Sequence, residues 1–294
     1  MRWLKTALAL LALLVLAGQT PAYGPAGPRG APDRAQQWLV PTPVADRAAH
    51  AVLYRPAGGG PFRLAVIAHA TTQNVLRRAQ MPQPEYRALA AFLVAHGFAV
   101  LVPERLGHGA TGGPYLEDQG DCDEADYAAS GRATAGQIRM ALDFLRRQPF
   151  IRTDAAIVIG HSAGAWGALA LAGEDPKTIS AIIAFAPGRG GHANDIENQI
   201  CAPHTLIAAA QSFGRGARVP VTWLVAANDT YFSPAFSKKL VDAFRAGGGK
   251  AEFHALPAYD SEGHWLPETE SGVRLAAFDL DRVLKGQAPL AKNR

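Results

Sequence analysis

Hydrophobic and polar positions follow two distinct patterns along the chain. Five runs are almost continuously apolar and rich in β-branched residues, as is typical of strands buried on both faces of a parallel sheet. These runs span residues 63–70, 98–104, 155–161, 180–187 and 220–229. A run at 50–56 alternates and ends in proline, and a more polar run at 250–257 suits an edge strand. The pattern predicts a mostly parallel sheet.

Helical patterns separate these runs. They cover residues 85–96, 130–148, 233–246 and 269–285, and a further Ala- and Leu-rich stretch follows residue 162. Pro234 stands in the first turn of one helix and Gly247 directly beyond its end, where helix boundaries favour these residues. Strands that alternate with helices form βαβ units. We therefore expect an α/β fold with a doubly wound, mostly parallel sheet and helices on both faces.

The N-terminal segment differs from the rest of the chain. Arg2 and Lys5 precede an unbroken apolar run at 7–17, and small residues with prolines follow it. This order is typical of a secretory signal peptide, and the run is shorter than the ~20 apolar residues of a membrane span. An uncleaved anchor is the alternative. We expect export to the periplasm or the extracellular space, with a signal peptide at 1–22, a Pro/Gly-rich linker at 23–36 and one catalytic domain at 37–294.

Composition and charge narrow the classes of function. Hydrophobic residues make up 48% of the 294 positions and charged residues 18%, which allows a large core and excludes a disordered chain. The formal net charge is +4, removal of Arg2 and Lys5 lowers it to +2, and no basic block occurs. We therefore expect neither a nucleic-acid partner nor a stable membrane anchor after signal cleavage. No cofactor or metal is expected, because no HExxH motif is present.

One serine stands between two glycines where a predicted strand gives way to a predicted helix. The segment reads Gly160-His161-Ser162-Ala163-Gly164. G-x-S-x-G in this setting is the nucleophile-elbow motif. The tight turn strains the backbone of the serine, and side chains at the glycine positions would collide with neighbouring elements. Ser162 is therefore the candidate nucleophile, and an ordinary tight turn is the alternative.

A serine hydroxyl needs a base, which is usually a histidine held by a carboxylate. On this kind of sheet the chain order is serine, acid, histidine. Asp229 ends the strand run at 220–229, 67 residues after Ser162, and His264 lies in a glycine-flanked loop 35 residues further on. We predict a Ser162–His264–Asp229 triad, with Asp195 as the alternative acid.

Other titratable side chains fit these roles less well. His254 stands inside a predicted edge strand, where an outward polar position explains it. His161 adjoins the serine and points the wrong way for a base, and His192 could at most contact substrate. Glu262 is too close to His264 in sequence to reach its far ring nitrogen.

Tetrahedral chemistry also needs oxyanion donors and a pocket. The Ala163 N–H follows the nucleophile directly, at a helix N-terminus. A second donor is expected from the loop after the strand at 63–70; we favour the Thr71 N–H, with Ala70 as the alternative. The long segments 106–128 and 187–216 are expected to build the pocket.

The only two cysteines, Cys122 and Cys201, both lie in the part expected to be exported. An even pair usually bonds in an oxidising compartment. We predict a disulfide that joins two loops at the carboxyl edge of the sheet, one from each side of the Ser162 strand. Two buried free thiols are the alternative, and the absence of CxxC spacing disfavours zinc.

Five segments, taken in order, resemble the α/β-hydrolase family and within it the dienelactone-hydrolase-like branch. They read LYRPAGGGPFRLAVIAHA, GFAVLVPERLGHGATGG, IGHSAGAWGALAL, VAANDTYFSP and EGHWL, within about residues 50–270. The resemblance implies the α/β-hydrolase fold. Two positions depart from it: Ala70 follows His69 where the family usually has glycine, and Ser162 stands where dienelactone hydrolase uses cysteine.

These departures disfavour cleavage of dienelactones and favour a serine esterase. We expect an exported serine hydrolase that cleaves small-molecule carboxylic esters through an acyl-enzyme intermediate. A peptidase or amidase of the same fold is the first alternative. A hydrolase-fold binding protein without turnover is the second. The acyl and alcohol groups and the oligomeric state are left open by the sequence.

Overall fold

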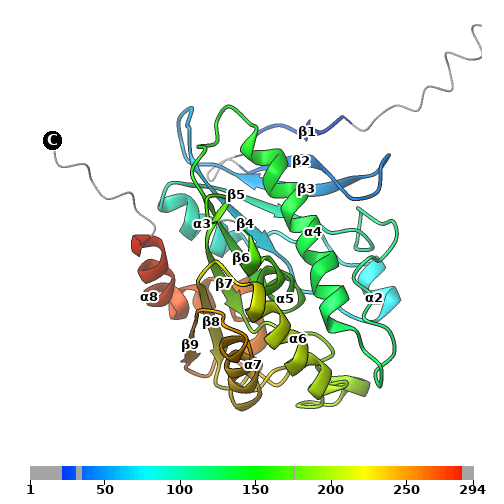
Figure 1. The fold of residues 1–294 in the computed structure, drawn as a ribbon. Coiled ribbons are helices and arrows are strands. Elements are labelled where there is room, and N and C mark those ends of the chain that lie inside the picture. The colour runs from blue at the N-terminus through cyan, green and yellow to red at the C-terminus, as the bar shows by residue number, and fades with distance from the viewer. Residues whose placement is uncertain (1–21, 31–34, 175, 287–294) are drawn as a thin grey trace, which may run out of the picture.

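The computed structural model describes residues 22–30, 35–174 and 176–286, so the signal peptide expected at 1–22 lies outside this part except for its last residue. In this part, nine strands form one sheet in the order β1-β2-β3-β5-β4-β6-β7-β8-β9 (Figure 1). The strands are β1 (Gly24–Pro25), β2 (Gln36–Pro41), β3 (Ala48–Tyr54), β4 (Arg63–Ala68), β5 (Phe98–Pro103), β6 (Ala156–His161), β7 (Ile179–Phe185), β8 (Val221–Ala226) and β9 (Ala251–Leu256). Pairs from β1 to β5 are antiparallel and the later ones parallel, which confirms the mostly parallel sheet.

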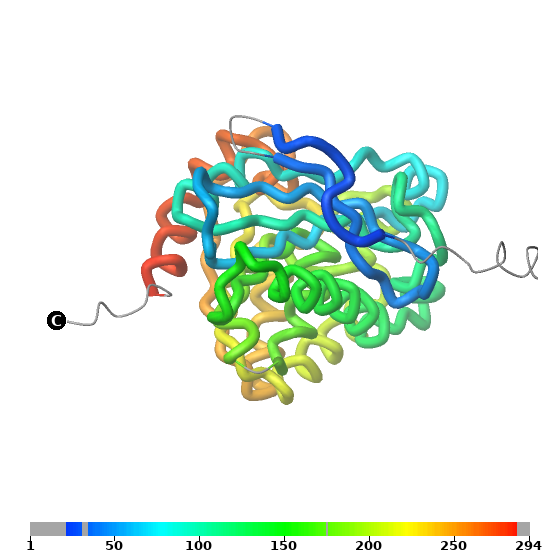
Figure 2. The backbone as a smooth tube through the Cα atoms, turned by 90° about the horizontal axis from the view of Figure 1, so that it is seen from above, coloured from blue at the N-terminus to red at the C-terminus, as the bar shows by residue number. Residues whose placement is uncertain are grey.

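Helices cover both faces of the sheet. The helices are α2 (Val75–Ala79), α3 (Arg87–Ala95), α4 (Tyr127–Arg146), α5 (Ala163–Ala170), α6 (Pro203–Gly216), α7 (Pro234–Ala246) and α8 (Glu270–Gly286). Helices α4 to α7 pack in one layer, and α3 and α8 pack in the other (Figure 1). Seen from above, the N-terminal strands lie at one end of the molecule and the yellow and orange segments near α7 at the other (Figure 2). Among the described residues, none of these helices has the length and hydropathy needed to cross a bilayer.

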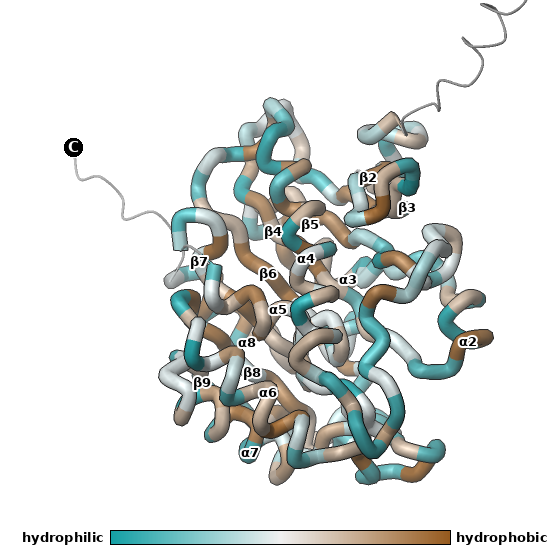
Figure 3. The backbone as a smooth tube through the Cα atoms, turned by 45° about the vertical axis from the view of Figure 1, so that its right-hand side comes forward, coloured by the Kyte–Doolittle hydropathy of each residue, from teal (hydrophilic) through white to brown (hydrophobic). Residues whose placement is uncertain are grey.

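The central strands are mostly apolar, as the brown colouring of β4 and β6 shows (Figure 3). Val158 of β6 joins the core cluster of α4 to α7, whereas Ile157 and Ile159 join the cluster of α3 and α8. Each side chain of this kind contributes about 1.5–3 kcal/mol when it leaves water. The sheet is therefore held from both faces, which explains why its strands read as continuous apolar runs.

All the predicted strands and helices are present, with small shifts at their ends. Helix α4 begins at Tyr127, three residues before the predicted start, because the Asp126 side chain caps it by accepting from the Ala129 N–H. The sequence pattern misses α2, α6 and the strands β1 and β2. Strand β2 begins at Gln36, and β1, inside the segment expected to be a linker, pairs with it.

The chain reverses its direction of travel across the sheet at β4. This strand pairs with β5 on one side and β6 on the other. The loops that follow β4 and β6 therefore diverge and leave a crevice at the carboxyl ends of the strands, where ligands bind in such sheets. Three short 3₁₀ helices complete the described elements: η1 (Leu171–Gly173), η2 (Ala193–Asp195) and η3 (Gly263–Glu268).

Candidate active site

Ser162 occupies a strained turn between β6 and α5. Its backbone has φ 54° and ψ −118°, a region that a non-glycine residue adopts at a cost of about 1–3 kcal/mol. Its N–H donates to the Phe185 carbonyl at 2.9 Å, and its carbonyl accepts from the Trp166 N–H at 2.8 Å. A Cβ at Gly160 would collide with the backbone of α5, and one at Gly164 with the carbonyls that end β4. The two glycines are therefore required by close packing around the serine.

Asp229 and His264 meet at the same edge of the sheet. Asp229 follows β8, His264 lies in η3, and His264 Nδ1 is 2.9 Å from Asp229 Oδ2. Both side chains are buried. Because a carboxylate accepts, Nδ1 carries the proton and Nε2 keeps its lone pair. Asp229 Oδ1 accepts from the N–H groups of Tyr231 and Phe232 at 2.9 and 2.8 Å, which fixes the carboxylate.

Asp195, the alternative acid, is exposed and lines the same cavity as Ser162 and His264. Among the described residues, Asp229 is the carboxylate that contacts the His264 ring. His254 lies on β9 instead, with Nδ1 3.0 Å from Asp279 Oδ1. The geometry thus brings together the histidine and the acid that the chain order predicts.

Two residues that the sequence analysis did not assign support the His264 loop. Glu262 Oε1 accepts from the His264 N–H at 2.9 Å, so this carboxylate holds the backbone and not the ring. The Tyr231 ring stacks on the His264 ring with centroids 4.2 Å apart, and the His192 ring stacks on the far side of Tyr231 at 3.5 Å. Their nearness to Asp229 and His264 in sequence was the available signal.

Ser162, Ala163 and His264 line a cavity of about 490 Å³. The expected wall segments reach it through Gln119 and through residues 188–195. A larger hollow of about 580 Å³ lies at the amino ends of β8 and β9, at the opposite edge of the sheet. It contains none of the candidate catalytic residues, so the smaller cavity is the candidate active site.

The loop after β4 distinguishes the two candidate oxyanion donors. The Ala70 N–H donates to the Tyr86 hydroxyl at 3.2 Å and is therefore occupied. His69 Nδ1 donates to the Ala70 carbonyl at 2.5 Å. In a trans peptide the N–H points opposite to the C=O, so the Thr71 N–H points away from the His69 ring. It has no partner within the described residues, and Thr71 lines the cavity that contains Ser162.

Two buried imidazoles hold this loop. His69 Nε2 accepts from the Arg105 N–H at 3.0 Å, and Arg105 Nη1 donates to the His69 carbonyl at 2.8 Å. His108 Nδ1 faces the carbonyls of Arg105 and Leu106, so its Nε2 accepts from the Thr71 hydroxyl at 2.6 Å. Burial, aided by the Arg105 charge, lowers the pKa of His108 to about 4, which keeps the ring neutral. The sequence analysis gave these side chains no role.

A buried ionic cluster lies behind the site. Glu117 contacts the guanidinium groups of Arg105 and Arg189, and all three side chains are buried. Burial by itself raises the pKa of Glu117, but the two guanidiniums outweigh it and hold the pKa of that carboxyl well below its usual range. The cluster joins the segment after β5 to the segment after β7.

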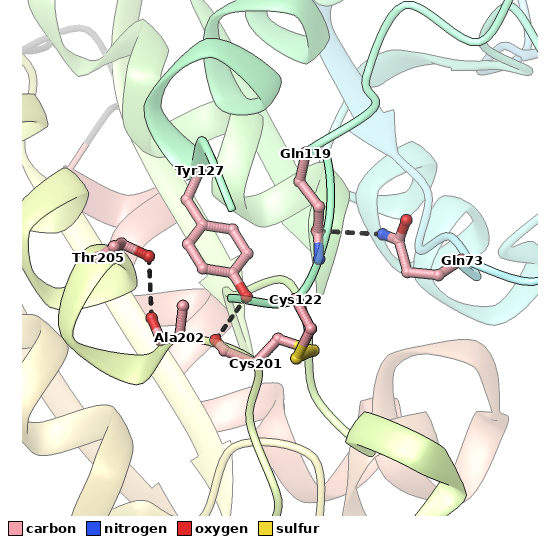
Figure 4. Close-up of a disulfide and its surroundings, with 7 residues drawn as sticks. All are labelled: Gln73, Gln119, Cys122, Tyr127, Cys201, Ala202 and Thr205. Atoms are coloured by element: carbon pink, nitrogen blue, oxygen red, sulfur yellow. Dashed lines mark hydrogen bonds between the residues drawn. A yellow bond between two sulfur atoms is a disulfide. The ribbon is translucent and has the colours of Figure 1, made fainter. Parts of the chain in front are cut away.

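A disulfide between Cys122 and Cys201 joins the same two segments, as predicted (Figure 4). The Tyr127 hydroxyl, at the start of α4, donates to the Cys201 carbonyl at 2.6 Å. Gln73 Nε2 donates to Gln119 Oε1 at 3.1 Å and so links the loop after β4 (the oxyanion-side loop) to the loop that carries Cys122. Three loops of the pocket are therefore connected to one another.

No group of three or more His, Cys, Asp or Glu side chains in the described part of the chain is arranged to hold a metal ion. The chemistry available at this edge of the sheet is a hydroxyl, an imidazole, a carboxylate and free N–H donors. These are the parts of nucleophilic acyl transfer.

A family model described as serine aminopeptidase, S33, matches residues 83–215, which include Ser162 but neither Asp229 nor His264. No curated protein matches the sequence significantly.

Solved structures with the same fold include esterases, peptidases and a dienelactone hydrolase. A Klebsiella pneumoniae protein provisionally named a dienelactone hydrolase has 15% identity and a TM-score of 0.56, covering 85% of this chain and 96% of its own. A cold-adapted esterase from an Arctic intertidal metagenomic library has 17% identity and a TM-score of 0.56, covering 87% and 96%. Dipeptidyl peptidase 4 of Porphyromonas gingivalis has 13% identity and a TM-score of 0.59, covering 86% of this chain and 35% of its own. Likeness at these identities establishes the fold.

Proposed function

We propose that this chain, a member of the α/β-hydrolase family, is a serine hydrolase that cleaves carboxylic esters with Ser162, His264 and Asp229. The observation that carries the proposal is the 2.9 Å contact between His264 Nδ1 and Asp229 Oδ2 in the cavity that the strained Ser162 also lines. A backbone φ of 54° at a non-glycine residue costs stability. Strain of this kind clusters at sites where it positions a functional side chain.

In the proposed acylation step, Ser162 Oγ attacks the ester carbonyl and its proton passes to His264 Nε2. The imidazolium that forms is stabilised by Asp229, whose own position is held by two backbone N–H groups. His264 then gives the proton to the leaving alcohol, and the acyl group stays on Ser162. Water, deprotonated by His264, releases the acid and restores the serine.

The negative charge on the carbonyl oxygen in both steps needs fixed donors. We assign the Ala163 N–H, the first of α5 and therefore without an intrahelical partner, and the Thr71 N–H. The occupied Ala70 N–H supports this choice over the alternative. The neutral rings of His69 and His108 act as positioning groups, because they contact the loop and not the reacting atoms.

A fluorophosphonate probe and a series of p-nitrophenyl esters test the proposal. We expect covalent labelling of the wild-type protein at Ser162, ester turnover, and loss of both in Ser162→Ala. Absence of labelling and of turnover in a folded wild-type protein would refute it.

Amide hydrolysis is the second candidate, favoured by the description of the matching family model as serine aminopeptidase. It would use the same residues with an amine as leaving group, which His264 must protonate more completely. An aminopeptidase substrate assayed beside the esters separates the two. The cystine supports the further proposal that the chain is exported, because disulfides persist in oxidising compartments.

A further inference from the structure

A second cavity, of about 330 Å³, adjoins the candidate active site. The two cavities share Thr71, Thr72 and Trp265 as a common wall. Because Thr71 is also the proposed oxyanion donor, the two cavities meet beside the expected position of the substrate carbonyl. Met81, Pro82 and Pro84 contribute apolar side chains to the remaining lining.

Among the described residues, two carboxylates line this cavity, and Glu268 is the one that has no arginine partner. The Glu268 side chain is 42% exposed, and its Oε1 lies 3.3 Å from the Tyr86 hydroxyl and 3.2 Å from His161 Nδ1. Its Oε2 has no hydrogen-bond partner among the described residues. Burial opposes ionisation, but contact with His161 and Tyr86 outweighs it and lowers the pKa of Glu268, so the group is ionised at neutral pH.

Within the described chain, the cavity lining contains no permanent cation to balance this charge. No lysine or arginine lines the cavity in the described part of the chain. Burial lowers the pKa values of His161 and His69. The contact with Glu268 opposes this shift at His161, which is a partial counter-charge outside the cavity lining. The other lining carboxylate, Glu85, is already held by Arg87 at 2.9 Å.

We propose that this cavity is a substrate subsite for an alkylammonium group, and this proposal rests on the proposed esterase function. The apolar wall receives the alkyl carbons, the free oxygen of Glu268 faces the positive nitrogen, and the half-exposed Trp265 ring offers a cation–π contact. The favoured substrates are esters whose acyl or alcohol part ends in a protonated or quaternary amine.

Matched ester pairs test the subsite, because they differ only in replacement of N⁺ by carbon. Butyrylcholine is compared with 3,3-dimethylbutyl butyrate, which probes the alcohol side. An ester of 4-(trimethylammonio)butyrate is compared with the same ester of 5,5-dimethylhexanoate, which probes the acyl side. We expect kcat/KM to favour the cation by about five- to tenfold in at least one pair, the size of a partly desolvated cation–π and ionic contact.

Two variants assign the preference to one carboxylate. Glu268→Gln should bring the ratio within the preferred pair close to one, whereas Glu85→Gln, the same change in a carboxylate of the same cavity already paired with Arg87, should keep it. The ratio matters more than either rate, because Glu268 contacts Tyr86 and His161, which also contact the catalytic loops. Damage to those loops slows both members of a pair alike.

The two proposals fail in different ways. If p-nitrophenyl esters are hydrolysed but neither pair favours the cation, or if Glu268→Gln retains the preference, the subsite is refuted and the esterase stands. If no ester is hydrolysed and no fluorophosphonate is bound, the esterase fails. Choline binding to the wild-type protein, followed by saturation-transfer NMR, then decides the subsite: binding lost in Glu268→Gln supports it, and absence of binding overturns it.

Discussion

Ser162 has an ordinary hydroxyl, and its proposed reactivity comes from the groups that surround it. The backbone strain at this residue aims the side chain into the cavity, and His264 is the group that can take its proton. Triad members act as a unit, so their losses are not additive. Ser162→Ala and His264→Ala should each abolish ester turnover and leave the fold intact, as circular dichroism would verify. His254→Ala is the matched control and should keep near-wild-type activity; the opposite result would move the base to β9.

Asp229→Asn tests the carboxylate. The asparagine amide has the same shape as the carboxylate, but its NH₂ group favours the wrong tautomer of the imidazole. It also leaves the imidazolium without a counter-charge. In serine triads this change costs about 10⁴-fold in kcat. We expect a loss of that order in steady-state ester kinetics. Asp195→Asn, an equal change on the wall of the same pocket, should cost less than tenfold. A large loss in Asp195→Asn with little in Asp229→Asn would transfer the acid role.

The candidate nucleophile, acid and base are readable from the sequence because each follows a recognisable strand run in a fixed order. Tyr231, Glu262 and His108 are not, because their roles depend on which loops meet in space. Glu262 illustrates the limit: its closeness to His264 signals a contact and argues against one with the far ring nitrogen, but it does not identify the backbone N–H as the group that is bound. Local proximity alone does not say which atom of a neighbour is bound.

At the level of elements, the turn from β6 into α5 depends on a close approach to the end of β4. A Cβ at Gly164 would overlap the Ala68 and His69 carbonyls. Gly164→Ala should therefore displace either the helix or the oxyanion-side loop and lower kcat by at least about 100-fold, in line with the cost of misplacing a catalytic group by 1 Å. Gly136→Ala in α4 is the control, since its Cβ meets nothing within 4 Å. That variant should keep activity and gain about 0.5–1 kcal/mol of unfolding free energy, measured with urea.

Elements were predictable where burial leaves a strong pattern. Strands β4 to β8 are continuous apolar runs because helices cover both faces. Strand β2 was missed because two glutamines and a proline interrupt its apolar pattern and because it lies near the open end of the sheet, beside a segment rich in proline and glycine. Helix α6 was missed because Ala202, with φ 36°, precedes it without a side-chain cap, and its start lies inside a segment that reads as a loop.

The disulfide links two of the loops that form the pocket. It closes a segment of 79 residues, worth at most ~4–5 kcal/mol in the chain-entropy model. Cys122→Ser/Cys201→Ser should lower the melting temperature and raise KM more than it changes kcat, because the Gln119 and 188–195 walls lose a common anchor. Mass analysis after alkylation, with and without reductant, checks the bond itself. An unchanged KM would mean that the disulfide stabilises the fold but does not shape the pocket.

Across the whole molecule, the buried ionic cluster spans the site from the β5 side to the β7 side. Arg105 holds the oxyanion-side loop, Arg189 anchors the loop after β7, and Glu117 contacts both. The sheet positions the strand ends, but the loops after β4, β5 and β7 must also be held in fixed positions relative to one another. Both features connect these loops: the ionic cluster lies behind the pocket, and the disulfide lies in its wall.

The cluster makes a specific prediction for stability against pH. Since the folded-state pKa of Glu117 lies below its unfolded value of about 4.3, its stabilisation is complete above the unfolded value and is lost progressively as the pH falls from there through the lower folded-state pKa. Glu117→Gln should lower the unfolding free energy by about 3–5 kcal/mol at pH 7, because two buried guanidiniums lose their counter-charge. Urea unfolding from pH 7 to 3 should show this difference shrinking below about pH 5. Glu124→Gln, an exposed change in the same loop, should change neither stability nor its pH dependence. A difference between wild type and Glu117→Gln that stays constant down to pH 3 would mean that Glu117 acts through packing and hydrogen bonds alone, with its charge contributing nothing.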